Sequence, residues 1–179
     1  MEKFLLHTCC APCGIAIIDE LKSKYDLTVF FYNPNIYPEE EYLKRKAEVI
    51  RVCEEFGVPM IDMDYEIDKW QEIVKGKEDE PEGGGRCPIC FGLRLEKTAA
   101  TAKDKGFEIF ATTLTMGRNK KADIINPLGL AIGKKYGVKF FEEDWKKDGR
   151  QEKSAEFVRN KNIYRQNYCG CAYSWTVAE

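Results

Sequence analysis

The stretch HTCCAPCG at residues 7–14 holds three of the chain's eight cysteines, Cys9, Cys10 and Cys13. A further pair, Cys87 and Cys90, has the spacing C-x-x-C, as do Cys10 and Cys13. Each pair encloses a proline, which indicates that it lies at the start of a helix. The free N–H groups and the positive dipole end of a helix start lower a thiol's pKa, and the thiolate is the form that binds metal. The two pairs therefore predict a metal site made of thiolates, for which zinc and an iron–sulfur cluster are both suitable.

A third group, Cys169 and Cys171, lies in the stretch YRQNYCGCAYS near the end of the sequence. The single glycine between the two cysteines gives the backbone the freedom that a tight turn needs. Thiols this close can cycle between a dithiol and a disulfide. The pair is therefore interpreted either as a redox couple or as two further metal ligands.

Two more residues could take part in this chemistry. Cys53 falls in line with Leu43, Ala47 and Ile50 on a predicted helix, so we expect a buried, unreactive thiol. His7, the only histidine, lies in a predicted strand beside the first cysteines. It could tune a metal through a hydrogen bond to a ligand, or it could be a core histidine whose ring nitrogens are both satisfied.

The composition is that of a folded protein in a reducing compartment. A chain of 179 residues, of which 44% are hydrophobic, predicts one domain over residues 1–179, with a C-terminal segment that carries the Cys-Gly-Cys pair. The sequence has no apolar run of about 18 residues, so we expect no membrane span, and its first apolar run, FLL, is too short for a signal peptide. We therefore expect a cytoplasmic protein, in which clustered cysteines are more often metal-binding or catalytic than paired in disulfides.

Strands are predicted to alternate with helices along the chain. The predicted strands cover residues 3–8, 27–33, 58–65, 107–115 and 139–144. The predicted helices cover residues 11–25, 39–56, 87–106 and part of 119–137, and residues 65–86 are expected to form a polar connection. This alternation predicts a three-layer α/β fold with a mostly parallel sheet.

In such a fold the ligand binds outside the carboxyl ends of the strands, and the first cysteines follow the first strand directly. A fold that handles ATP at this place needs a glycine-rich phosphate loop. The chain has thiols there instead, and it contains neither a Walker motif nor the pattern G-x-G-x-x-G.

The charge is unevenly distributed although the net charge is only −2. Residues 37–82 hold 15 acidic and 7 basic side chains, whereas residues 134–165 hold 10 basic and 6 acidic ones. The basic segment runs into NIYRQNYCGC, where aromatic residues stand among arginine and glutamine. This combination is typical of an RNA-binding surface, and it also suits an ordinary solvated surface.

Three motifs carry a resemblance to a known family: LLHTCCAPC, PEGGGRCPICFGLRLEKTA and YRQNYCGCAYS. In order and spacing they resemble the QueH family, the cobalamin-independent epoxyqueuosine reductases, over almost the whole chain. The resemblance implies a fold similar to that of the adenine-nucleotide α-hydrolases, with cysteines in place of the phosphate loop. It also implies the last step of queuosine synthesis, in which the epoxide of epoxyqueuosine in a tRNA anticodon is reduced to the alkene and water is released.

The resemblance further implies a [4Fe–4S] cluster. By match to the family pattern, its ligands would be Cys9, Cys10, Cys87 and Cys90. Cys13 is left near the cluster without an assigned role. Because a cluster held by four cysteines has no open iron, a second iron beside Cys13 would supply a Lewis acid for the epoxide oxygen.

The resemblance makes Cys169 and Cys171 the redox-active pair. Removing an epoxide oxygen takes two electrons, which a dithiol can hold, and an unidentified donor would have to restore them. The residues that flank the pair could hold the anticodon base or a phosphate; they are Tyr164, Arg165, Gln166 and Tyr168.

Two other functions remain open on the sequence. A zinc-held RNA-binding module would use four thiolates and the basic stretch but would leave the C-G-C pair idle. A general disulfide oxidoreductase would use Cys10 and Cys13 but would leave Cys87 and Cys90 without a role. Colour separates an iron–sulfur protein, which is brown, from a colourless zinc protein.

Overall fold

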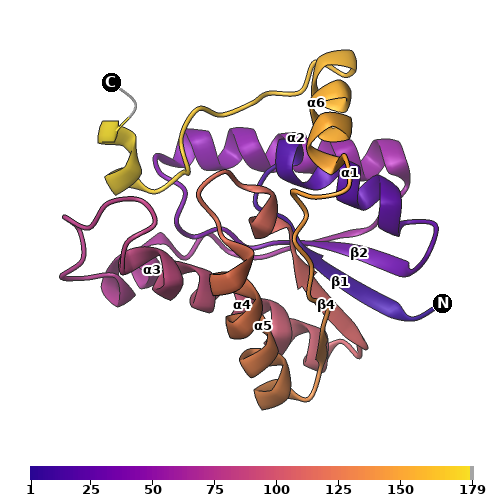
Figure 1. Cartoon of the computed structure of the whole chain (residues 1–179), viewed down its shortest axis with the longest axis horizontal. Helices are drawn as coiled ribbons and strands as arrows, with labels where there is room; N and C mark the ends of the chain where they lie inside the picture. The colour runs from indigo at the N-terminus through magenta and orange to yellow at the C-terminus, as the bar shows by residue number, and fades with distance from the viewer. Residues whose placement is uncertain (178–179) are drawn as a thin grey trace.

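A five-stranded parallel sheet forms the centre of the protein in the computed structural model, which describes residues 1–177 (Figure 1). Its strands are β1 (Lys3–His7), β2 (Asp26–Phe31), β3 (Met60–Asp62), β4 (Ile109–Thr112) and β5 (Lys139–Phe140). They lie in the order β3-β2-β1-β4-β5, and each neighbouring pair is parallel. Leu6 at the centre of the sheet pairs with Val29 on one side and Ala111 on the other. The predicted parallel α/β sheet is confirmed.

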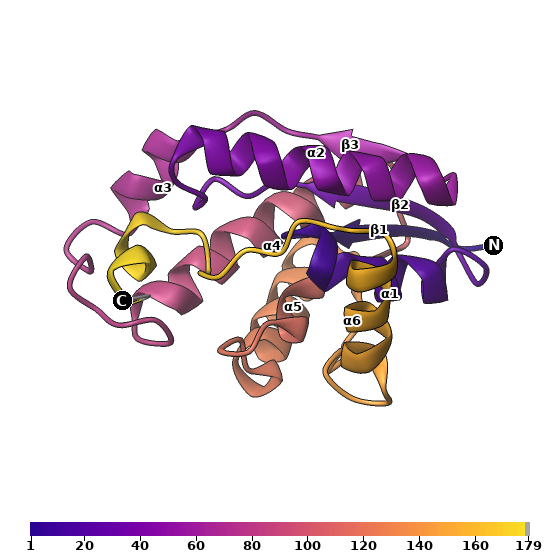
Figure 2. The ribbon, with the colours of Figure 1, turned by 90° about the horizontal axis from the view of Figure 1, so that it is seen from above.

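Helices cover both faces of this sheet, which gives three layers with the sheet in the middle (Figure 1); Figure 2 looks down on one of the two helical layers. On one face lie α1 (Ala11–Leu21), α2 (Glu39–Phe56) and α6 (Arg150–Asn160), and on the other lie α4 (Arg86–Asp104) and α5 (Ala122–Tyr136). Alternate residues of β1 serve the two faces: Phe4 and Leu6 pack in the core under α1 and α2, and Leu5 packs in the core under α4 and α5. A strand buried on both sides must be apolar throughout, which explains the unbroken run FLL.

Two helices arise where the sequence predicted none. α3 (Ile67–Ile73) lies inside the predicted polar connection, because Ile67, Trp70 and Val74 form an apolar face that packs near the start of α4. α6 lies in the basic segment and packs on α1. Its apolar residues are few, and the hydroxyl of Ser154 donates to the carbonyl of Pro12.

Several predicted boundaries were wrong, and most of the affected elements are shorter than predicted. α1 ends at Leu21 rather than residue 25, and β3 and β5 are shorter than the predicted strands. The fourth strand ends at Thr112 and continues as a short 3-10 helix, η1 (Thr113–Met116). α5 is helical throughout and contains Pro127. The strands at the sheet's edges pair on one side only, so few of their residues are held in extended form.

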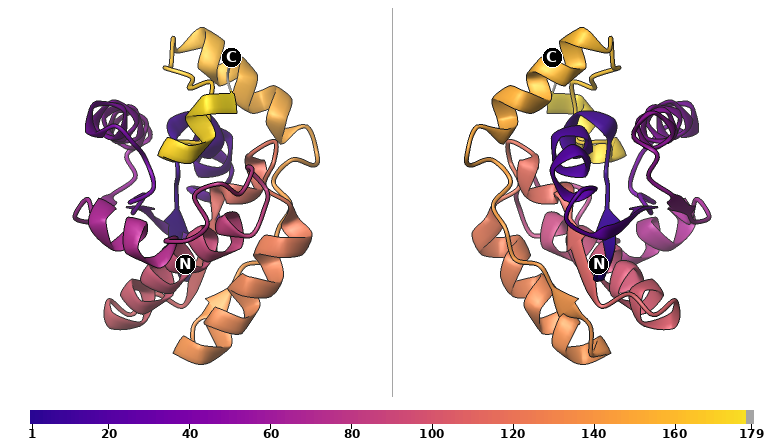
Figure 3. Two further views of the ribbon diagram at one scale, coloured as in Figure 1. Left: turned by 90° about the vertical axis from the view of Figure 1, so that its left-hand side faces the viewer. Right: turned by 90° about the vertical axis from the view of Figure 1, so that its right-hand side faces the viewer.

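The last segment leaves α6 and runs back across the molecule to a 3-10 helix, η2 (Ala172–Val177), as Figures 1 and 3 show. Tyr173 there stacks on Trp70 of α3 with ring centroids 5.9 Å apart. Cys171 is buried in the same small cluster with Val74 and Cys90. This packing brings the third cysteine group next to the start of α4.

Candidate active site

The first cysteine group lies at the point where the sheet's strand order reverses. From β1 the chain crosses to β2 through α1 on one face, whereas β4 connects to β5 through α5 on the other. The loops after β1 and β4 therefore diverge and leave a crevice at the carboxyl ends of the strands. The two loops meet at Cys9, whose N–H donates to the Thr113 hydroxyl over 3.3 Å. The predicted position of these cysteines is thereby confirmed.

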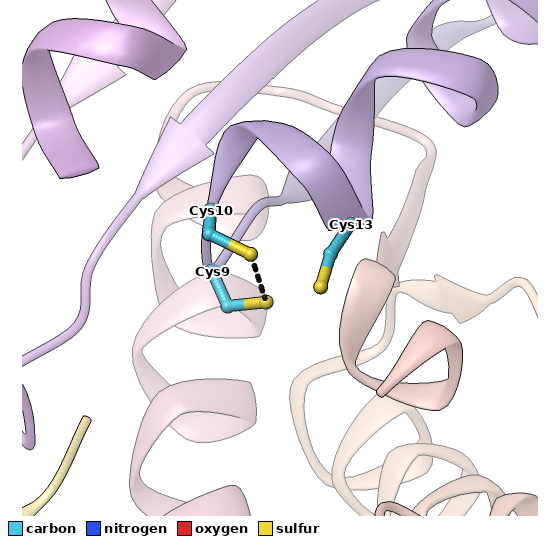
Figure 4. Close-up of side chains that lie close together, drawn as sticks. All are labelled: Cys9, Cys10 and Cys13. Carbon is cyan, nitrogen blue, oxygen red and sulfur yellow. Dashed lines mark hydrogen bonds between the residues drawn. The ribbon is translucent and has the colours of Figure 1, made fainter. Parts of the chain in front are cut away.

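The sulfurs of Cys9, Cys10 and Cys13 point toward one another (Figure 4) and lie within 4.8 Å of each other. Cys10 directly precedes α1, and Cys13 lies in its first turn. The turn is tight: a Cβ on Gly14 would lie 2.6 Å from the Thr8 methyl group. In the described part of the chain, no other group of three cysteine, histidine or acidic side chains lies close enough together to hold a metal ion.

Burial and mutual hydrogen bonds shift the pKa values of the three thiols in different directions. Hydrogen bonds with Cys10 and Cys13 hold the pKa of Cys9 well below its usual value, although burial raises it. Cys13 lowers the pKa of Cys10, but Cys9 and burial raise it to about 12. The hydrogen bonds to Cys10 and Cys9 raise the pKa of Cys13 well above its usual value. Cys9 is thus the thiol of the group whose pKa is lowered, and the expected lowering at a helix start does not extend to the other two.

Two cations from different elements face these sulfurs. Arg94 of α4 is fully buried, and its Nη2 has no hydrogen-bond partner among the described residues. Burial lowers the pKa of Arg94, but the charges of Cys90, Cys169 and Cys9 raise it by more. Burial likewise lowers the pKa of Lys120, and Cys169, Cys9 and Cys13 raise it by more. Both side chains therefore stay charged and stabilise thiolates.

Cys87 and Cys90 lie at the start of α4, outside the group of three sulfurs. The helix begins at Arg86, one residue before its predicted start at Cys87, and Gly85 is its N-cap. The N–H of Gly83 donates to the Cys87 sulfur over 3.2 Å. Burial is the largest cause that raises the pKa of each of these thiols. Here too, burial outweighs the expected effect of the helix start.

The Cys-Gly-Cys segment is fixed through its backbone. Gly170 has φ of +128°, which L side chains rarely adopt, and its carbonyl accepts from the N–H of Tyr37 over 2.8 Å. Arg45 of α2 donates to the Cys169 carbonyl over 2.9 Å and to the Tyr168 carbonyl over 3.2 Å. The two thiols are free in this structure. Cys169 lines the same cavity as the first cysteine group, and Cys171 is buried behind it.

The four residues predicted to hold substrate fall into separate roles. Gln166 donates through Nε2 to the Cys10 sulfur over 2.9 Å. Tyr164 donates its hydroxyl to Glu41, and Tyr168 donates to the Tyr37 carbonyl over 2.6 Å. Arg165 is exposed at the cavity.

Most of these groups line one open cavity of about 970 Å³, whereas Cys87, Cys90, Cys171 and Tyr164 lie outside its lining. Its wall includes residues that the sequence reasoning missed, namely Asn33, Asn35, Arg94, Arg118, Asn119 and Lys120. The run RNKK after the fourth predicted strand was a usable signal, because parallel strands bring their following loops to one edge. Arg94 gave no such signal, because only the packing of α4 brings it to the sulfurs.

The basic segment is less positive in space than in sequence. Six of its ten basic side chains have a carboxylate within ion-pair distance; they are Lys135, Lys146, Lys147, Arg150, Lys153 and Lys161. Arg150 by itself lies within ion-pair distance of three carboxylates, those of Glu20, Glu143 and Asp148. Of the segment's other four basic side chains, Arg165 lines the cavity, where Arg94, Arg118 and Lys120 from outside the segment also contribute positive charge.

Comparison with known proteins identifies the family. The family description "Epoxyqueuosine reductase QueH" matches residues 4–176. Curated proteins of that name are similar over 97% of this chain. One from Acinetobacter baylyi is 42% identical, and the match covers 80% of its length; one from Thermotoga maritima is 40% identical, and the match covers 91% of its length. The chain belongs to the QueH family. Its matched relatives are oxidoreductases by name, and the family match spans all eight cysteines.

Solved structures outside the QueH family are more distant. The U34-tRNA thiolase NcsA from Methanococcus maripaludis, described with its [4Fe–4S] cluster, superposes with a TM-score of 0.47 and 11% identity, over 90% of this chain and 68% of that one. The zinc-inhibited form of teicoplanin deacetylase Orf2 has a TM-score of 0.45 and 9% identity, over 76% of this chain and 65% of that one.

His7 and Cys53 complete the placement of the predicted residues of this QueH chain. His7 is fully buried; Nε2 lies 3.0 Å from the Tyr32 carbonyl and Nδ1 lies 2.8 Å from the Thr112 hydroxyl. Burial lowers the pKa of His7 to about 4. Since both ring nitrogens are occupied, the core-histidine interpretation is the one that the structure supports.

Cys53 is buried as predicted, and burial raises its pKa to about 12. The stripe that led to this prediction was wrong, because Leu43, Ala47 and Ile50 are exposed. The buried face of α2 is formed by Tyr42, Arg45, Val49, Val52 and Cys53. Within the described chain, no helix combines the length and apolar character needed to cross a bilayer.

Proposed function

We propose that this QueH protein reduces epoxyqueuosine in a tRNA anticodon to queuosine, with release of the epoxide oxygen as water. The observation that carries the proposal is the family match over a chain in which three buried or half-buried thiols and Cys169 line one open cavity. The cavity is large enough for an extruded nucleoside, because ligand pockets of small molecules measure about 300–1,000 Å³.

Cysteine thiolates are the ligands of iron–sulfur clusters, and three cysteines, Cys9, Cys10 and Cys13, meet at this cavity. The proposed ligands are Cys9, Cys10, Cys87 and Cys90, and the cluster would supply single-electron transfer. Support for the fit comes from Arg94, whose buried Nη2 has no partner among the described residues and could donate to anionic sulfur. Cys13 then remains as a thiol beside the cluster and is the proposed ligand of a second iron.

Cys169 and Cys171 are the proposed redox pair. Oxidation to a disulfide releases two electrons and two protons, which matches the demand of epoxide removal. Position supports this role: Cys169 faces the cavity, Cys171 is buried next to Cys90, and Arg45 fixes the backbone between them and α2. An external reductant would then restore the dithiol.

The tRNA would approach over the mouth of the cavity. Arg165 is exposed there with Arg118, so both are suited to phosphate contacts. Tyr164 and Tyr168 use their hydroxyls within the protein, which leaves ring stacking as their means of contact with a base. Gln166 is proposed to orient Cys10 rather than the base, because its amide already contacts that sulfur.

The test is anaerobic purification followed by iron and sulfide analysis and an assay on tRNA that carries epoxyqueuosine. We expect a brown protein that converts the modified nucleoside to the alkene, with Cys90→Ala losing both iron and activity. Cys53→Ala is the matched control, since it also removes a buried thiol from a helix but should keep both. A colourless, zinc-loaded protein that binds tRNA without changing it would support the RNA-binding module instead.

A further inference from the structure

Lys120 is a cation at the cavity whose role neither the family match nor the sequence motifs assign. It lies in the loop between η1 and α5 and lines the cavity together with Cys9, Cys13 and Cys169. Among the described residues, no carboxylate lies within ion-pair distance of its ammonium group, and that group donates no hydrogen bond to them. The other lysine beside it, Lys146, is fully engaged. Lys120 is half-buried and, among the described residues, has neither a carboxylate nor a hydrogen-bond partner for its ammonium group, so it faces the cavity beside the cysteine thiols, where substrate would bind.

The Lys146 side chain fixes the loop that carries Lys120. The Lys146 ammonium donates to the carbonyls of Thr115 and Lys120 over 2.7 Å each and to that of Gly117 over 3.3 Å. The N–H of Lys120 closes a turn on the Gly117 carbonyl over 3.1 Å. Three donor contacts from one side chain fix the backbone of a segment that has no regular secondary structure of its own.

Gly117 makes room for the Lys120 side chain. A Cβ at Gly117 would lie 3.0 Å from the Lys120 Cδ and 3.1 Å from its Nζ. The backbone of Gly117, with φ of −69° and ψ of 141°, is one that any residue adopts. A methyl group at position 117 would therefore displace the Lys120 side chain, whereas the backbone itself does not call for glycine.

We propose that Lys120 is a catalytic residue of the proposed epoxide reduction, whose ammonium group binds the substrate oxygen and stabilises the negative charge that develops there as a C–O bond breaks. Lys146 and Gly117 are the positioning residues that aim it. The inference rests on the proposed function, because it needs an oxygen that becomes anionic.

The balance of the reaction explains the need for such a cation. Conversion of an epoxide to an alkene breaks two C–O bonds, consumes two electrons and two protons, and releases the oxygen as water. The electrons come from the reductant that the proposed function already requires. The first C–O bond to break leaves its electron pair on oxygen, and a cation already fixed in position stabilises that charge more than solvent would, because it need not reorganise as the charge develops.

The experiment compares kcat and KM on tRNA carrying epoxyqueuosine for anaerobically purified variants. Lys120→Met should lower kcat by about 100-fold with a small change in KM, since loss of one oxyanion donor costs that much. Lys120→Arg should restore part of the rate. Lys121→Met, which removes an exposed charge from the next position, should leave kcat unchanged.

Gly117→Ala and a double-mutant cycle test the positioning. Gly117→Ala should fold normally but lower kcat, because the added methyl group displaces the Lys120 side chain. Lys146→Met should also lower kcat, and the pair Lys120→Met with Lys146→Met should be no slower than Lys120→Met alone, because the two residues act through one ammonium group. A purely structural role of Lys146 would make the two losses multiply.

Iron and sulfide content and the rate of reduction by dithionite are measured on every variant. If Lys120→Met loses iron or its reduction slows, the lysine serves the metal site and the inference is wrong. The inference is also wrong if Lys120→Met keeps its iron and the parental kcat. If the parent protein itself forms no product on a fully iron-loaded preparation, the proposed function fails, and it fails independently of any Lys120 result.

Discussion

Replacing Arg45 with methionine should destabilise the protein and release the Cys-Gly-Cys segment. The Arg45 side chain is 2% exposed; its Nε pairs with Glu41 at 2.7 Å, and its two other nitrogens donate to the carbonyls of Cys169 and Tyr168. Methionine has a similar length and apolar stem but no donors. The variant therefore leaves a nearly buried carboxylate without its cation and two carbonyls without their donor.

The size of the effect follows from this burial. Removing one partner of a buried ion pair costs about 3–5 kcal/mol. The Glu41 carboxylate keeps the hydroxyl of Tyr164 as a partner at 3.0 Å, so we expect the lower end, about 3 kcal/mol. For a chain of this size that loss lowers Tm by about 6–12 °C.

Arg51 offers a matched control on the same helix. It also pairs with a glutamate, Glu48, at 2.9 Å and donates to two backbone carbonyls, those of Lys161 and Asn162, but its side chain is 45% exposed. An exposed pair contributes about 0–1 kcal/mol, so Arg51→Met should change stability little.

The assay is urea unfolding of the two variants and the parent, with thiol labelling of the native proteins as a second readout. Arg45→Met should label faster at Cys169, because the backbone of that segment is no longer held to α2. Equal losses of stability for Arg45→Met and Arg51→Met, or an unchanged labelling rate, would refute the reasoning from burial.

Three further predictions concern packing, RNA and redox chemistry. Gly129→Ala should destabilise the protein by about 1–3 kcal/mol, because its Cβ would overlap the Phe140 ring. Gly92→Ala, whose Cβ would have no atom within 4 Å, should be neutral or stabilising, and thermal unfolding compares the two variants. Affinity for an anticodon stem-loop should fall steeply as salt rises, because phosphate contacts release counterions, and a flat titration would count against the RNA surface. Cys169→Ser and Cys171→Ser should abolish turnover while iron content stays near that of the parent; loss of iron in both would make these cysteines ligands.

The sequence predicted the elements whose signal is local. Prolines inside both C-x-x-C pairs indicated helix starts, and the alternation of apolar strands with helices predicted the parallel sheet and placed the first cysteines at its carboxyl edge. α3 was missed although Ile67, Trp70 and Val74 repeat at helical spacing, because the polar residues around them dominated the interpretation. The stripe on α2 was placed on the wrong face, because the buried face includes Arg45, a charged residue whose ion pair with Glu41 allows its burial.

The rest of the site could not be derived from spacing along the chain. Arg94 reaches the sulfurs only because α4 crosses behind the first cysteines, and Lys120 reaches them because the loops after β1 and β4 diverge from neighbouring strands. The ion pairs could not be derived from the sequence either, because their partners come from distant segments. The basic excess of residues 134–165 is reduced by carboxylates such as Glu20, Glu55 and Glu96, which lie far away in sequence.

The most direct measurement is a single-turnover reaction between the anaerobically purified protein and tRNA that carries epoxyqueuosine, followed by digestion and mass analysis of the anticodon nucleoside. The account predicts loss of one oxygen atom from the nucleoside and, without added reductant, the appearance of a disulfide between Cys169 and Cys171. An unchanged nucleoside on fully iron-loaded protein would contradict the proposed reduction. Product formed while both thiols stay reduced would contradict the assignment of the pair as its electron source.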